Sequence, residues 1–403
     1  MVRYSNRVLP SLAAVLLATV STVSAQDLRV GSAGAPTSTE LPAGGWNLTP
    51  SLLYGASWDS NVLLKGRGDD TRADLLNVMN PRGDAEFVGR RGQFSASYDG
   101  AFLIYRELNT LDSYDQHASV SARRSLSKHV TMFANDMLAI TPTTELSLLI
   151  GIPFLRTGAR VNDLRTGIEA DLTKRTSITA SYHFDWVRFD PVPTFSQLLG
   201  GESHGGLLFL RHKLSDLTAL TVEYDRQFSS VGRSETFDIE NTAAGFERKL
   251  TVAMRIYAAG GISHLGESSL APAHTSPRYH AGLAYQIRKG TLDVIYDRSF
   301  APSFGFAGTT DSKEFSVRVY MPLDRKVYTR SAVSWRTNSY LQAVDTSLDS
   351  RWFEASIGYL TQPWMRVEGF YASALQTTTL PGGTLDRNRF GVQVITAKPV
   401  RIR

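Results

Sequence analysis

The 403-residue chain contains no cysteine. Disulfide bonds, thiolate metal sites and a lipid anchored on a cysteine are therefore excluded. Its 43 basic and 38 acidic residues are scattered along the chain, unlike the concentrated basic patch of a nucleic-acid-binding protein. Beyond the N-terminal leader, no apolar run approaches the roughly 20 residues of a transmembrane helix. A helical membrane protein is excluded, whereas a membrane barrel, in which only alternate strand residues face lipid, is not.

Motifs for catalysis and for cofactor binding are also missing. The eight histidines are spread along the chain without an HExxH motif, and no glycine-rich phosphate-binding loop is present. His204 and His212 lie near Ser203, and an outer-membrane lipase would use these residue types, but nothing in the sequence makes them converge. We therefore predict that the protein is not an enzyme and that it has no cofactor and no metal site.

The N-terminus has the pattern of a secretory signal peptide. Arg3 and Arg7 precede a short apolar core, LPSLAAVLLATV (9–20), and VSA (23–25) forms a small-residue cleavage site. Cleavage there lowers the formal net charge from +5 to about +3. The segment that follows is rich in Gly, Pro, Ser and Thr, which is typical of a flexible linker. The predicted division is a signal peptide at 1–25, a flexible periplasmic segment at 26–45 and an outer-membrane β-barrel at 46–403.

Alternation of apolar and polar residues is the most informative pattern in the chain. In SITASYHFDW (177–186), every second residue from Ile178 to Trp186 is apolar, and the residues between them are polar or charged. The same alternation returns in LTVEYD (220–225) and in EFSVRVYM (314–321). Successive strand side chains point to opposite faces, so these segments predict strands with one apolar and one polar face.

Two kinds of interruption alternate between these segments. Tight polar connections recur roughly every 35–45 residues, about the length of two strands and one loop, and longer irregular connections lie midway between them. Eight tight turns separate nine hairpins, which predicts about 18 strands, with 16 to 20 left open. The segment 73–89 is the weakest strand candidate, because Pro81 and Gly83 interrupt it. The predicted tight turns are 89–92, 125–128, 173–176, 214–217, 247–250, 287–290, 322–326 and 361–364, and the long connections include 60–72, 142–158, 191–203, 265–277 and 377–386.

The pattern predicts an all-β fold, a transmembrane up-and-down antiparallel β-barrel with short periplasmic turns and longer extracellular loops. A soluble sandwich divides into units of about 100 residues, whereas here one alternating pattern continues without a domain linker. Closing the sheet satisfies every backbone N–H and C=O group, as strands inside lipid require. A secreted soluble propeller or solenoid is the alternative, but no blade or solenoid motif repeats.

If the apolar face points outward, the polar face lines the lumen, and 16–18 strands enclose an aqueous channel. One interpretation is a solvated lining braced by arginine–carboxylate pairs. The other is a selectivity surface in which acidic and basic walls filter solutes by charge. The residues predicted to line the pore are Asp99, Arg123, Arg165, Glu169, His183, Asp185, Glu223, Asp225, Asp238, Glu240, Arg255, Asp293, Asp297, Glu314, Arg318, Arg330, Glu354, Arg366, Glu368 and Arg389.

The stretch YGASWDSNV (54–62) ends the first predicted strand and opens the first external loop. Taken alone, its Asp-Ser-Asn segment is an ordinary polar turn. Together with SASYDGAFLIYREL (95–108) and the repeated hairpins, it resembles the bacterial beta-barrel porin 2 group of exopolysaccharide-associated barrels. The resemblance implies an outer-membrane barrel of a Gram-negative bacterium, with export of exopolysaccharide as a role. The family motif consists of Trp58, Asp59, Ser60, Asn61 and Val62.

We therefore predict an outer-membrane porin that forms a passive aqueous channel. The alternative is a non-conducting structural or adhesive surface barrel that acts through its extracellular loops. In that alternative the long loop 142–158 plugs the lumen. This loop carries the apolar stretch LSLLIGIPF (146–154), which suits a segment that folds inward as a constriction or contacts a partner. The expected partners are outer-membrane lipid, the outer-membrane assembly machinery, polysaccharide and periplasmic export components, with no nucleic acid. One departure is that the chain finishes AKPVRIR, whereas many such barrels finish on an aromatic residue.

Overall fold

The structure is a computed structural model, and it describes residues 44–144, 152, 154–191, 198–232, 235–268, 272–305, 308–341, 346–379 and 383–402. The predicted signal peptide and nearly all of the predicted periplasmic segment lie outside the described residues. No helix in the described ranges is long and apolar enough to cross a membrane.

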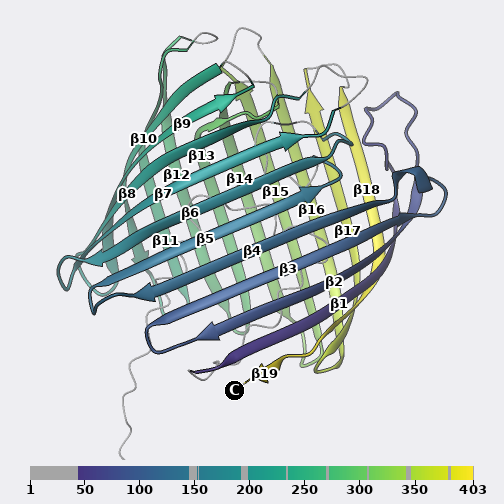
Figure 1. Ribbon diagram of the computed structural model, residues 1–403, viewed down its shortest axis with the longest axis horizontal. Helices are drawn as coiled ribbons and strands as arrows, with labels where there is room; N and C mark the ends of the chain where they lie inside the picture. Colours follow the sequence, from purple (N-terminus) through teal and green to yellow (C-terminus); the bar gives the residue numbers. More distant parts are fainter. Residues whose placement is uncertain are drawn as a thin grey trace, which may run out of the picture.

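The described chain consists almost entirely of strands (Figure 1). Eighteen long strands follow one another, and a short nineteenth ends the described chain. The elements are β1 (Trp46–Asp59), β2 (Asp74–Val88), β3 (Gly92–Tyr105), the 3-10 helix η2 (Asn109–Leu111), β4 (Ser113–Ser125), β5 (Val130–Thr141), β6 (Ala159–Asp171), β7 (Thr176–Phe189), β8 (Gly201–Lys213), β9 (Thr218–Val231), β10 (Glu235–Lys249), β11 (Met254–Leu265), β12 (His274–Ile287), β13 (Gly290–Pro302), β14 (Thr309–Pro322), β15 (Val327–Tyr340), β16 (Ser347–Gln362), β17 (Met365–Thr378), β18 (Thr384–Ala397) and β19 (Val400–Ile402).

The strands form a closed barrel. Each long strand pairs antiparallel with the next one in the chain, and β1 returns to pair with β18, from Ser51 opposite Ala397 to Asp59 opposite Arg389 (Figure 1). The short β19 extends this seam by pairing with the first residues of β1. Closure leaves the 18-stranded sheet without an open edge. The predicted fold class and the predicted strand number are confirmed.

Tight turns join the strands at one end of the barrel and longer connections join them at the other, which we call the turn end and the loop end (Figure 1). Four turns have the same local structure, in which a Ser or Thr side chain accepts hydrogen bonds from backbone N–H groups two or three residues later. The four residues are Ser127, Thr173, Ser215 and Thr251. Such side-chain-to-backbone bonds favour turns over a continuing strand.

The fourth of these turns corrects a predicted boundary. The sequence prediction placed a turn at 247–250, but β10 continues to Lys249 and the turn follows at 250–253. The N–H of Leu250 donates to the carbonyl of Met254, and Thr251 closes the turn. The charged residues that suggested the earlier turn belong to the strand, where Glu247 accepts hydrogen bonds from Arg211.

The predicted weak segment forms a complete strand, β2, despite Pro81 and Gly83. Its pairing with β1 is continuous, but its pairing with β3 passes from Met79 opposite Phe102 to Arg82 opposite Asp99. Proline has no N–H to donate, so the irregularity falls where the proline lies.

The barrel wall has an apolar outer face. On β13, β14 and β15, Tyr296, Phe315 and Trp335 are direct neighbours in the strand register, and all three are exposed. Across the seam, exposed Tyr371, Phe390 and Trp58 form a second such row. Rows of exposed aromatic side chains on the outer face of a barrel wall are typical of the lipid-facing surface of membrane barrels. A soluble protein of this size would bury so many large apolar side chains.

Candidate channel interior

The inner face can be identified from ion pairs that skip a strand. Arg123 on β4 reaches Glu169 on β6 at 2.5 Å, and Arg278 on β12 reaches Glu223 on β9 at 2.7 Å. Side chains of non-neighbouring strands approach each other on the concave side of a curved sheet, so these residues face the interior. The strand register then assigns each of the remaining wall residues to the inner or the outer face.

All but two of the predicted lining residues share this inner face. They come from twelve strands, and many are paired with a charge of opposite sign. They are Asp99, Arg123, Arg165, Glu169, His183, Asp185, Glu223, Asp225, Arg255, Asp293, Asp297, Glu314, Arg318, Arg330, Glu354, Arg366, Glu368 and Arg389.

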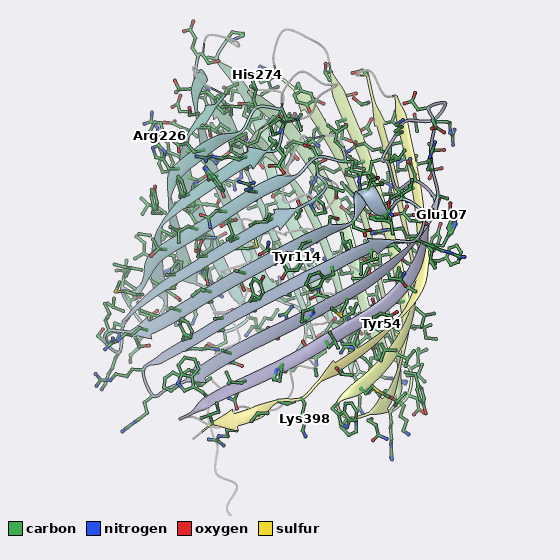
Figure 2. All side chains as sticks on the ribbon, turned by 45° about the vertical axis from the view of Figure 1, so that its right-hand side comes forward. Tyr54, Glu107, Tyr114, Arg226, His274 and Lys398 are labelled. Carbon is green, nitrogen blue, oxygen red and sulfur yellow. The ribbon has the colours of Figure 1, made fainter. Side chains whose placement is uncertain are left out.

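Asp238 and Glu240 are the two exceptions, and for them the predicted position is wrong. They lie opposite Phe228 and Arg226, in the register rows of the outer face. Arg226 bonds both carboxylates, at 3.1 Å from Asp238 and 3.2 Å from Glu240, and Figure 2 places Arg226 on the outer contour of the wall.

The physical reason is that the loop end is apolar on its inside. Phe237 and Ile239, which alternate with these two acids on β10, point inward and are buried in an apolar cluster. The usual order of a membrane barrel, apolar outside and polar inside, is therefore inverted at the loop end of β10.

The charges of the inner face are unevenly distributed. On β6, β7 and β9, the acids Asp163, Asp185, Glu223 and Asp225 lie together. On β15, β17 and β18, nearly half-way round the closed strand order, the inner face carries Arg330, Arg336, Arg366, Arg387 and Arg389, accompanied by fewer acids. An acidic wall facing a basic wall sets up a field across the lumen. Pairs such as Arg336–Glu314 at 2.7 Å also brace the lining, so both sequence interpretations have residues that fit them.

The connection between β5 and β6 folds into the barrel. The backbone N–H of Phe154 donates to Gln376 Oε1 of β17 at 2.7 Å, and its ring contacts Trp352 of β16 with 5.2 Å between centroids. Thr144 and Leu155 hold the two arms of the connection together through three hydrogen bonds. Strands β16 and β17 lie across the barrel from β5 and β6 in the closed strand order. The described part of this connection therefore crosses the lumen.

Other connections meet it there. Ile152 is only 2% exposed and belongs to a buried cluster with Phe237, Ile239 and Phe304. The backbones of Leu199, between β7 and β8, and Gly305, between β13 and β14, exchange hydrogen bonds of 2.9 and 2.7 Å. Inward-folded segments from three connections thus form an apolar core inside the loop end. The apolar stretch 146–154 was the sequence signal for it; Ile152 and Phe154 lie inside the barrel, and the rest of that stretch lies outside the described residues.

The predicted family motif lies at the seam, where β1 ends. Asp59 is completely buried and bonds Arg387 of β18, with Nε at 3.0 Å from each carboxylate oxygen. Val62 is also fully buried, beside Leu76 and Tyr105. The sequence pattern indicates the motif but not these partners, because they are remote in the chain.

The residues considered for a lipase do not converge. Ser203 is fully buried on the inner face, where its hydroxyl meets that of Ser229 at 2.8 Å. His204 lies on the outer face beside Phe228, and His212 bonds Thr176 at the opposite end of β8. Within the described ranges, no group of three His, Cys, Asp or Glu side chains could hold a metal ion.

Comparison with known proteins gives only a general likeness. No family model matches the chain and no curated protein matches it, so membership of the beta-barrel porin 2 group stays a prediction. Among solved structures, OccAB4 of Acinetobacter baumannii aligns at 9% identity and TM-score 0.48, covering 90% of this chain and 100% of its own. OpdO of Pseudomonas aeruginosa aligns at 11% identity and TM-score 0.47, covering 90% and 98%. OccK2 (OpdF) of the same species, in complex with glucuronate, aligns at 9% and 0.44, covering 89% and 98%.

Proposed function

We propose that this chain is an outer-membrane barrel that forms a passive aqueous channel for small charged or polar solutes. The observation that carries the proposal is the division of one continuous wall into an exposed apolar outer face and a charged inner face. Such a wall suits lipid on one side and water on the other. Eighteen strands give a lumen wide enough for water and solutes.

The inward-folded connections give this channel a constriction near its loop end. The segment at Phe154 spans toward β17 and separates the outer opening from the charged lining. Solutes that pass it meet the acidic residues of β6, β7 and β9 on one side and the arginines of β15, β17 and β18 on the other. Selectivity by charge and dipole follows from that arrangement.

Ion selectivity in planar bilayers tests the proposal. Asp185→Asn removes an inner carboxylate of β7, and Asp238→Asn is the matched change on the outer face. We expect Asp185→Asn to move the reversal potential in a salt gradient toward anion preference and Asp238→Asn to leave it unchanged. Equal shifts for both variants contradict the assignment of the lumen.

A second function is favoured by the apolar core inside the loop end, which could close the barrel permanently. In that case the protein is a non-conducting structural or adhesive surface barrel. Silent bilayers containing correctly folded protein, shown by the heat-dependent gel mobility of native barrels, would favour this function over the channel.

Export of exopolysaccharide belongs to the proposal only through the family resemblance. It brings with it polysaccharide and periplasmic export components as partners, alongside outer-membrane lipid and the barrel assembly machinery. Deleting the gene and finding unchanged surface polysaccharide would exclude it. Export through a cleavable signal peptide is tested separately, because mature protein from the outer membrane is then expected to begin at Gln26.

A further inference from the structure

The seam motif has a hydrogen-bonding pattern that reaches beyond the seam. Asp59 fixes the end of β1 through Arg387 and accepts a hydrogen bond from the N–H of Asn61 at 3.0 Å. Ser60 exchanges hydrogen bonds with the backbone of Asn388, at 3.0 Å through its N–H and at 2.8 Å through its hydroxyl oxygen. The first and last long strands are therefore joined through side chains just where their backbone ladder ends.

Asn61 then fixes the connection that follows. Its side-chain amide donates to the carbonyls of Lys65 at 2.8 Å and Asp386 at 3.1 Å, and its carbonyl oxygen accepts from the N–H of Lys65 at 3.1 Å. All the polar atoms of this side chain are thereby used on backbone groups. An alanine at this position would leave the turn without these bonds, so the direction of the next peptide group depends on Asn61.

That next peptide group carries the carbonyl of Val62, which accepts a hydrogen bond from the side chain of Arg156. This arginine comes from the far arm of the connection between β5 and β6. Arg156 Nη1 donates to the carbonyl of Val62 and to the hydroxyl of Tyr105, both at 3.2 Å, and Nη2 donates to the carbonyl of Leu111 at 2.7 Å. Its guanidinium also lies 4.9 Å from the centre of the Tyr105 ring. One side chain thus ties the inward-folded segment to the connections between β1 and β2 and between β3 and β4.

We propose that Asn61 and Arg156 are positioning residues for the constriction: the seam motif presents the Val62 carbonyl, and Arg156 uses it to hold the segment at Phe154 across the lumen. This rests on the proposed channel for its functional meaning. The contact of Arg156 with the Val62 carbonyl, which Asn61 positions and which we call the latch, is a structural feature. It can be tested without measuring conduction.

The absence of cysteine from the chain makes a direct test available. Phe154→Cys and Gln376→Cys, at positions joined by a 2.7 Å hydrogen bond, are introduced together, and the folded barrel is treated with a short bifunctional methanethiosulfonate cross-linker. Arg156→Met is added to release the latch, Arg156→Lys to retain one charged donor, and Asn61→Ala to remove the turn. Arg160→Met, at an exposed arginine that is the second residue of β6, is the control.

Losing one hydrogen bond from a charged donor changes the equilibrium between the held and the released position of the segment at Phe154 about tenfold. We expect Arg156→Met and Asn61→Ala to reduce the initial cross-linking rate several-fold, Arg156→Lys to restore much of it, and Arg160→Met to leave it unchanged. In bilayers, the same two variants without the added cysteines are expected to show larger or noisier conductance. Heat-dependent gel mobility shows that each barrel remains folded, a property that a released latch does not alter.

The outcomes separate the latch from the channel. Slower cross-linking with altered conductance supports both proposals. Slower cross-linking in barrels that stay silent supports the latch and contradicts the channel. An unchanged cross-linking rate in folded Arg156→Met overturns the latch, whatever the barrel conducts.

Discussion

The ion pair at the seam provides the sharpest test of how the barrel is closed. Arg387→Met keeps the side-chain volume but removes the guanidinium that bonds both carboxylate oxygens of Asp59. Asp59 has no exposed surface, and the Arg387 side chain is 5% exposed. The variant leaves a buried carboxylate that has lost its guanidinium partner and still accepts a hydrogen bond from the N–H of Asn61. Breaking a buried pair in this way costs about 3–5 kcal/mol of unfolding free energy.

The assay is reversible urea unfolding of the barrel in lipid vesicles, followed by tryptophan fluorescence. Asp59→Asn and the double variant complete a double-mutant cycle, which separates the coupling between the two residues from their individual contributions. We expect a coupling of about 2–3 kcal/mol, because the double variant no longer buries an uncompensated charge.

The control lies beside the seam at the same end of the barrel. Arg67 approaches Asp386 at 3.8 Å, with side chains 75% and 43% exposed. Arg67→Met should cost less than about 1 kcal/mol, since exposed pairs contribute little. If Arg387→Met were no more destabilising than Arg67→Met, or if the two seam variants were simply additive, the inference that this pair closes the seam would be wrong.

Two further predictions concern the wall. Val392→Arg, on the exposed outer face near the middle of β18, should lower the unfolding free energy of the barrel in vesicles by about 2–4 kcal/mol. Ser97→Arg, on the inner face, should lower it by less than about 1 kcal/mol. Equal costs in urea unfolding would contradict the assignment of the two faces. Gly261→Ala should cost about 1–3 kcal/mol because its Cβ would meet the carbonyl oxygen of Thr242, whereas Gly83→Ala, with open space around it, should stay within about 0.5 kcal/mol in the same assay.

The sequence predicted the fold because period-two alternation is a local property. A strand such as β7 shows its two faces within its own residues, and the turns at Thr173 and Ser215 are closed by their own side chains. These features need no partner distant in the chain, so the strand number and the up-and-down order follow from them.

The local pattern predicted the wrong face for residues at the loop end, where the inside of the barrel is also apolar. On β10, Phe237 and Ile239 alternate with Asp238 and Glu240, and nothing local tells which pair points outward. The inward-folded segment carrying Ile152 reverses the usual order there. The predicted turn at 247–250 was also misplaced because a contact is remote in the chain. Glu247 looks like a turn residue in the sequence, but it bonds Arg211, which is two strands away and 36 residues back.

The alternation of side chains by itself determined that this chain is a closed up-and-down sheet with unlike faces, since each strand records which of its residues share a face. Only the tertiary structure decided what lies inside the loop end and what the seam motif binds. Asp59 and Arg387 are 328 residues apart, and Arg156 and Val62 are 94 apart. Closure of the cylinder brings them into contact, and contacts made by closure leave no periodic trace in the sequence.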